Sequence, residues 1–165
     1  MARTRSMKFP NTLTNLDTLM DKLQRGIGTK LLKSGGLAIK IGGSALAKTA
    51  NAIYFLIDGK IYSKVAADMA ALSGTVTNAK FNVFVFSVDN AGTLTTQMGT
   101  EAATIGGVVF PTIADGNVVI GFVVINPTGT GNFVGGTTAL DDITVVPNAV
   151  YIDTPFTLAP GIEAI

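Results

Sequence analysis

The chain has 165 residues, of which 47% are hydrophobic and 14% are charged, and its formal net charge is +1. This composition is typical of a folded domain and excludes a largely disordered chain. The sequence contains no cysteine and no histidine. It therefore has neither a disulfide framework nor a thiolate metal site, and it lacks the side chain that most often acts as a general base.

The charged residues are distributed unequally along the chain. Residues 1–48 contain nine Lys or Arg and two Asp, whereas residues 81–165 contain seven acidic residues and no basic one. Such a block asymmetry concerns the partners of a protein more than its fold. We expect the basic N-terminal end to bind an acidic surface.

Residues 1–36 are predicted to be an attachment segment. Residues 1–14 contain Pro10 and no periodic apolar pattern, which indicates an extended arm that at about 3.4 Å per residue would reach roughly 50 Å. A short amphipathic helix is predicted next from apolar residues at intervals of three and four, which are Leu16, Leu19, Met20 and Leu23. Gly26 is expected to end this helix.

The N-terminus has no apolar run of the kind found in secretory signals, and no stretch approaches the roughly 18 apolar residues of a membrane helix. We therefore expect synthesis in the cytoplasm and no membrane partner.

From Leu37 onward the pattern changes to strands. In "YFLIDGKIY" the pair Asp58-Gly59 separates two apolar runs, which is a strong hairpin signal. "AADMAAL", residues 66–72, is rich enough in alanine to predict one or two helical turns. The further expected strands are "FNVFVFSV", "TLTTQM", "IGGVVF", "NVVIGFVVI", "ITVV" and "AVYI". Short strands separated by Gly, Asn and Asp turns predict a mainly β fold, an antiparallel β-sandwich of jelly-roll-like or Ig-like type over residues 37–165.

Two of the predicted strands are apolar on both faces. Strand 81–88 has Phe84, Phe86 and Val88 on one face and Phe81, Val83 and Val85 on the other. In strand 118–125 the residues on both faces are likewise apolar. An antiparallel sheet ordinarily alternates between buried and wet positions, so these strands need a second cover. That cover is either the N-terminal helix or a neighbouring subunit, and we favour a homo-oligomer, a trimer rather than a dimer, with contacts through Phe81, Phe84, Phe86, Phe122 and Val124.

The sequence offers little catalytic chemistry, and we predict that the protein is not an enzyme and has no cofactor. Asp141 and Asp142 are adjacent, so in a strand they point to opposite faces and cannot act as an acid–base pair. Their expected role is in a solvated loop; a hard-cation site using Asp115, Asp141 or Asp142 is a weaker alternative, without EF-hand spacing to support it. The glycines of "GIGTK" and "GTGNFVGG" do not have the spacing of a phosphate-binding loop and are expected to form turns.

The basic N-terminal arm has three alternative interpretations. Nucleic acid binding is disfavoured, because Phe9 is the only aromatic residue before Tyr54 and base stacking usually accompanies such binding. A solvated arm without a partner is the second alternative. The favoured interpretation is docking on an acidic protein surface.

Four stretches of the chain, "IDGKIYSKVAADMAALSGT", "NVFVFSVDNAGTLTTQMGTEA", "GVVFPTIADGNVVIGFVVI" and "FVGGTTALDD", together resemble small virion structural proteins of tailed bacteriophages, of the head decoration, cement or head-fibre type. The resemblance covers roughly residues 53–153 and consists of strand and turn patterns without a catalytic signature. It implies a β-domain on the outer surface of the capsid shell, bound to the major capsid protein through a terminal segment and stabilising the shell as an oligomer.

Under this interpretation the basic segment contacts the capsid, and the acidic β-domain projects away from it. The expected capsid-binding residues are Arg3, Arg5, Lys8, Phe9, Lys22, Arg25, Lys30 and Lys33, with Phe9 as an apolar anchor. The alternative is that the N-terminal helix packs on its own domain. A rival function is a head-fibre or tail-associated module that recognises a host-surface ligand. Glycan recognition is weakened by the absence of tryptophan and by the presence of only three tyrosines.

Overall fold

The computed structural model describes residues 28–154. In that range the chain forms eleven strands and one 3-10 helix, and every strand pairing is antiparallel. The predicted mainly β, antiparallel architecture is therefore confirmed. The predicted arm and N-terminal helix lie outside the described residues. No helix in residues 28–154 has the length and apolar character that a membrane span requires.

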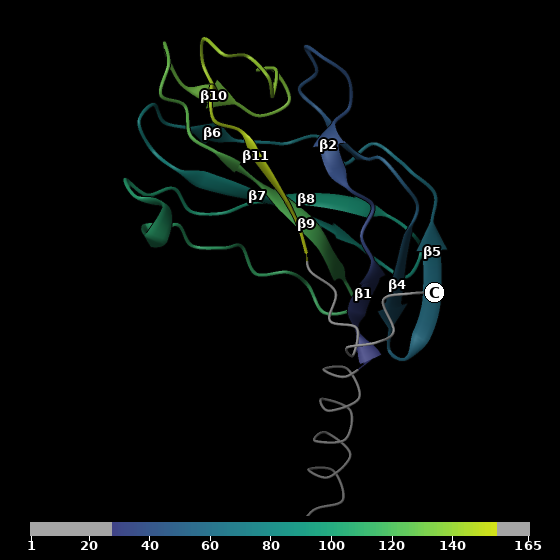
Figure 1. Ribbon diagram of the computed structural model, residues 1–165. Coiled ribbons are helices and arrows are strands. Elements are labelled where there is room, and N and C mark those ends of the chain that lie inside the picture. Colours follow the sequence, from purple (N-terminus) through teal and green to yellow (C-terminus); the bar gives the residue numbers. More distant parts are fainter. Residues whose placement is uncertain (1–27, 155–165) are drawn as a thin grey trace, which may run out of the picture.

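Two larger sheets form the body of the molecule (Figure 1). One has three strands in the order β1 (Lys30–Lys33), β4 (Ile53–Ile57), β5 (Lys60–Lys64). The other has four strands in the order β11 (Val150–Asp153), β9 (Val118–Ile125), β7 (Asn82–Val88), β8 (Leu94–Met98). Strand structure thus begins at Lys30, before Leu37.

Two small sheets and a helical turn complete the fold. β2 (Leu37–Ile39) pairs with β3 (Ala47–Thr49), and β6 (Thr75–Val76) pairs with β10 (Phe133–Val134). The 3-10 helix η1 spans Ile105–Gly107. Where a strand was expected in "IGGVVF" the chain instead forms η1 and a single bridge between Thr100 and Val109. The stretch "ITVV" forms turns and no strand.

The hairpin predicted at Asp58-Gly59 is confirmed. Asp58 has φ 50° and Gly59 has φ 77°, so both central residues take the left-handed conformation that a type I′ turn requires. The turn pairs Ile57 with Lys60 and sets the register of β4 against β5. Alternate residues of β4 therefore face the interior, and the residues between them face outward.

The prediction of helical turns in residues 66–72 is wrong. This segment is extended because its backbone groups pair with β3: Met69 N–H donates to the Ala47 carbonyl and Thr49 N–H donates to the Ala67 carbonyl. Met69 and Leu72 are buried. Tertiary pairing has overridden the helix propensity of alanine, which favours a helix only weakly in so short a segment.

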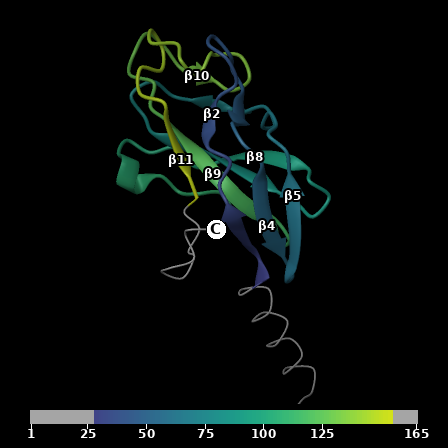
Figure 2. The ribbon, with the colours of Figure 1, turned by 45° about the vertical axis from the view of Figure 1, so that its right-hand side comes forward.

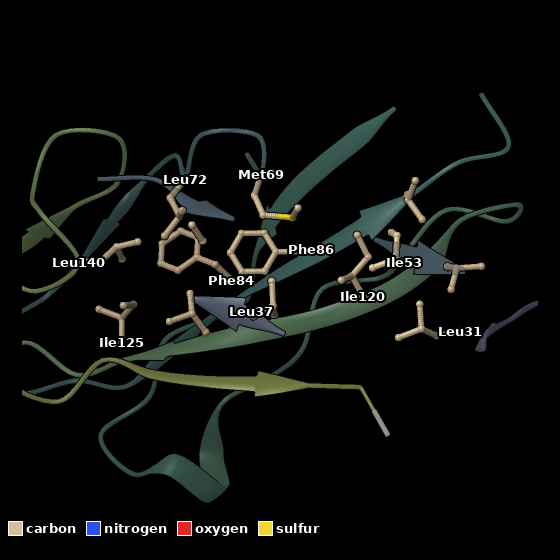
Figure 3. Packing of buried hydrophobic residues seen from close by; sticks show 14 of the residues in the cluster. Leu31, Leu37, Ile53, Met69, Leu72, Phe84, Phe86, Ile120, Ile125 and Leu140 are labelled. Carbon is tan, nitrogen blue, oxygen red and sulfur yellow. The ribbon is translucent and has the colours of Figure 1, made fainter. Parts of the chain in front are cut away.

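The core lies where the inner faces of the two larger sheets meet. Ile53, Phe55 and Ile57 of β4 belong to the same buried cluster as Phe84 and Phe86 of β7. Figure 3 shows the Phe84 and Phe86 rings pointing into this cluster beside Leu72 and Met69. Both rings have an exposed fraction of 0%. Phe84 and Phe86 therefore cannot be oligomer contacts in the folded chain, and that part of the predicted interface is wrong because the chain's own core covers them.

The opposite face of β7 is covered by residues 99–110. Val83 and Val85 are buried on this face, and Phe81 exchanges backbone hydrogen bonds with Ala102 in the covering segment. Gly99 packs so closely that a Cβ there would lie 2.5 Å from the Val109 carbonyl oxygen and 2.9 Å from Val83 Cγ2. Figure 2 shows η1 and the three-stranded sheet on opposite sides of β9. Within residues 28–154 the second face of β7 is thus covered by a segment of the same chain.

Candidate functional site

The carboxylates considered as cation ligands stabilise loops. The two Asp141 carboxylate oxygens each accept a hydrogen bond from Gly43 N–H at 3.0 Å. Asp142 Oδ1 accepts from the hydroxyl and the N–H of Thr144 at 2.6 and 2.9 Å, and these two bonds lower the pKa of the Asp142 carboxyl group. Residues 28–154 contain no group of three or more acidic side chains that could hold a metal ion.

Two open hollows lie beside these loops. One, of about 300 Å³, is lined by Asp58, Asp115 and residues around them, and Thr29 Oγ1 accepts the Asp58 N–H at its edge. The other, of about 260 Å³, is mainly apolar and is lined in part by Asp141 and Tyr151. Burial, followed by the charge of Asp141, raises the pKa of Tyr151 to about 12. We assign no chemistry to either hollow.

A cationic and apolar surface covers the outer face of the three-stranded sheet. The register pairs Lys30 with Leu56 and Lys33 with Tyr54 across β1 and β4, and pairs Leu56 with Ile61 across β4 and β5. Directly paired residues share a face, so these five side chains lie together on the outer side. We call this surface the cationic face and define it as Lys30, Lys33, Tyr54, Leu56 and Ile61.

The exposure of the cationic face is suited to contact with a partner. Ile61 is 70% exposed and Tyr54 is 43% exposed. The Lys33 Nζ lies 5.6 Å from the centre of the Tyr54 ring, close enough for a cation–π interaction that orients both side chains. The ion pairs within residues 28–154 are Lys40–Asp68 and Lys80–Glu101. Neither Lys30 nor Lys33 is neutralised by a carboxylate in that range, so both charges remain available to a partner.

An uncharged apolar surface lies on the outer face of the four-stranded sheet. The register pairs Val150 with Val124 and Ile152 with Phe122, which places these four side chains on one face. Phe110, from the covering segment, meets Phe122 edge to face at a centroid distance of 5.0 Å. We define the β9–β11 patch as Phe110, Phe122, Val124, Val150 and Ile152. The exposed fractions of Phe110, Val150 and Ile152 are 53%, 51% and 37%.

The structure places only some of the predicted contact residues on these surfaces. Lys30 and Lys33 lie on the cationic face, in strand β1. Phe122 and Val124 lie in the β9–β11 patch, and Phe81 is half-buried beside Ala102 on the same side of that sheet. The remaining predicted capsid-binding residues lie outside the described residues, and they are Arg3, Arg5, Lys8, Phe9, Lys22 and Arg25.

Some exposed apolar residues were missed at the sequence level. The hairpin prediction alone could have shown that Tyr54 and Ile61 share a face, because a two-residue turn at Asp58-Gly59 fixes the register, but not that this face is the exposed one. Phe110 carries no such signal. Its segment runs between β8 and β9, and only the tertiary structure brings it against Phe122.

Comparison of the chain with known protein families, with curated proteins and with solved structures finds no match. The functional argument therefore rests on the two surfaces. One is cationic and directly follows the basic N-terminal segment in sequence, and the other is apolar and uncharged. The inner faces of the two sheets pack on a common core, so these outer surfaces point away from each other.

Proposed function

We propose that the protein is a non-enzymatic structural component of a tailed-phage virion, a decoration or cement protein on the exterior of the capsid. The basic N-terminal segment and the cationic face bind an acidic surface of the major capsid protein, and the two larger sheets form a sandwich of jelly-roll-like or Ig-like type. The protein stabilises the shell as a homo-oligomer, a trimer rather than a dimer. The proposal rests on the resemblance of the strand and turn patterns and on the arrangement of charge.

The observation that carries the proposal is the position of the cationic face. Residues 1–27 contain Arg3, Arg5, Lys8, Lys22 and Arg25, and the chain then enters β1, where Lys30 and Lys33 lie on the outer face of the sheet. Between Asp21 and Asp58 the sequence contains no acidic residue, so the basic stretch that begins at Lys22 includes the two lysines of a face that also presents Tyr54 and Ile61. A surface that combines lysines with exposed apolar side chains suits an acidic protein partner.

The strength of such an attachment depends on the number of contacts. A single exposed ion pair contributes at most about 1 kcal/mol, so neither lysine could hold the protein on a shell alone. Several weak ion pairs together with apolar contacts from Tyr54 and Ile61, repeated over the copies of an oligomer, give a much higher overall affinity. We therefore expect attachment to weaken as salt concentration rises, because salt screens exposed charges.

Attachment to shells tests the proposal directly. Shells assembled from the major capsid protein of the same virus are incubated with four forms of the protein, and bound protein is measured after sedimentation of the shells. The full chain is expected to bind. Deletion of residues 1–14 is expected to abolish binding while circular dichroism still reports a folded β-domain.

A pair of charge-matched variants then tests the cationic face. Lys30→Gln/Lys33→Gln is expected to reduce binding strongly. Lys40→Gln/Lys48→Gln removes the same charge from β3 and from the residue that follows β2, and it is expected to have little effect. Full occupancy of shells by the truncated chain would refute the proposal. Binding to host cells without binding to shells would instead favour a head-fibre or tail-associated module.

A further inference from the structure

The outer face of the four-stranded sheet is divided into a polar half and an apolar half. Toward β8 it presents polar side chains, and Ser87 Oγ and Thr95 Oγ1 are 2.7 Å apart in a hydrogen bond. Toward β11 it presents the β9–β11 patch. A sheet face exposed to water would ordinarily be polar along its whole width. The apolar half therefore calls for a cover that residues 28–154 do not provide.

The size of the patch is comparable to that of a functional surface. Its five side chains and the neighbouring Val109, which is 60% exposed, present on the order of 400 Å² of apolar area, within the range of the largest patches on typical monomers. This is about half of the roughly 800 Å² that each partner contributes to a standard interface. The patch is thus large enough to form the apolar centre of an interface with a polar rim.

The charge pattern restricts the partner. None of the five patch residues is charged, and residues 81–154 contain no Lys or Arg. An acidic protein surface or a nucleic acid would therefore find no cation here and would be repelled by the acidic residues of this part of the chain. A partner must present an uncharged apolar surface, and the same patch on another copy of this chain meets that requirement.

We propose that the β9–β11 patch is a self-association surface that packs against the corresponding patch of a second copy around a symmetry axis. An apolar patch without charges can meet copies of itself at a two-fold axis, where one surface packs on the same surface of a second copy, or close to a three-fold axis, where three copies of the surface converge. The cationic face lies on the other sheet and points away, so self-association leaves it free. The inference deepens the proposed function, because it rests on the homo-oligomer proposed there and names its interface. It does not depend on capsid binding, although a shell with many equivalent sites would bring copies together.

The interface differs from the one expected from the sequence. Phe84 and Phe86 are in the core of each copy, and the contact is instead made by Phe122 and Val124 together with Phe110, Val150 and Ile152. Phe110 adds to the patch an aromatic side chain that comes from outside the strands of the sheet. Its edge-to-face contact with Phe122 holds two aromatic rings at the patch, and aromatic residues are enriched among the contacts that dominate association.

Analytical ultracentrifugation of the full chain and two matched variants tests this inference. Val150→Lys places a charge in the patch, on edge strand β11, at a side chain that is 51% exposed. Ile61→Lys makes a comparable change on edge strand β5 of the other sheet, at a side chain that is 70% exposed. Neither change removes a buried group, so both variants are expected to fold, and circular dichroism checks this.

The expected result is that the full chain and Ile61→Lys self-associate at micromolar concentration. Val150→Lys is expected to self-associate at least about 30-fold more weakly, as for loss of an interface hot spot. If Val150→Lys does not fold, Val150→Ser and Phe110→Ser provide the same test without a buried charge. A monomeric full chain, or loss of association in Ile61→Lys but not in the patch variants, would overturn the inference. Capsid attachment is a separate measurement, so failure of capsid binding and failure of self-association through this patch are distinguishable.

Discussion

The replacement Phe84→Ala separates the two roles that the sequence and the structure give to this ring. From the sequence, Phe84 was expected at a subunit interface. In the structure its exposed fraction is 0% and its ring meets Phe133 edge to face at a centroid distance of 5.8 Å. The structure therefore predicts that the variant loses stability within a single copy, at every protein concentration.

The expected loss follows from two terms. Removing the buried ring forfeits about 2 kcal/mol of transfer free energy. If the surroundings do not collapse, a cavity on the order of 100 Å³ remains and costs about 2 kcal/mol more at ~24 cal/mol per Å³. A total of about 4 kcal/mol is a large fraction of the 5–15 kcal/mol by which typical domains are stable. The melting temperature should fall by roughly 10–20 °C.

Urea denaturation, followed by the circular dichroism of the backbone, measures this loss. Phe110→Ala is the matched control, because that ring is 53% exposed and its truncation should change the free energy of unfolding by less than about 1 kcal/mol at low protein concentration. The measurement is repeated at two protein concentrations to separate folding from association. An unchanged midpoint for Phe84→Ala, or a loss that appears only at high concentration, would refute the placement of Phe84 in the core.

Three further predictions concern single residues. Hydrogen bonds from the Lys80 side chain and from the Thr77 backbone lower the pKa of Glu101 from 4.5 to about 2, so the contribution of Glu101 to stability is present above pH 4.5 and is lost as pH falls toward 2. The difference in unfolding free energy between the full chain and Glu101→Gln should therefore shrink over that range, and a constant difference would contradict this. A Cβ at Gly129 would overlap the carbonyl group of Thr144, so Gly129→Ala should cost about 1–3 kcal/mol in chemical denaturation, whereas Gly106→Ala, which meets nothing within 4 Å, should be nearly neutral. The pKa of Tyr151 is raised to about 12, so stability should fall as pH rises from 10 toward 12, and Tyr151→Phe should not show that fall if the assignment is right.

The sequence predicted local structure well where a local physical constraint acts. Asp58-Gly59 gave the hairpin because its two residues can take positive φ at little cost, and strand 82–88 was evident from its run of β-branched and aromatic residues. The alanine-rich stretch 66–72 was mispredicted as helical because its conformation depends on β3, which is distant in the chain. Short strands such as β6 and β10, with two residues each, leave no periodicity to detect.

The candidate surfaces were predicted only in part. The basic character of the N-terminal half pointed to Lys30 and Lys33, but their alignment with Tyr54 and Ile61 depends on the pairing of β1 with β4 and of β4 with β5. The apolar interface was expected on β7 and β9, and two of its five predicted residues, Phe84 and Phe86, proved to be core. Alternation shows which side chains share a face, but it does not show which of the two faces is covered.

By itself, the sequence determined that this is an antiparallel β protein with a hairpin at Asp58-Gly59 and a charge that changes sign along the chain, because turn conformation, strand periodicity and charge are properties of neighbouring residues. Only the tertiary structure decided that residues 99–110 cover the second face of β7 and that Phe110 joins Val150 and Ile152 in one exposed patch. Burial depends on segments that are far apart in the chain and meet only after folding, so no local pattern could distinguish the covered apolar face from the exposed one.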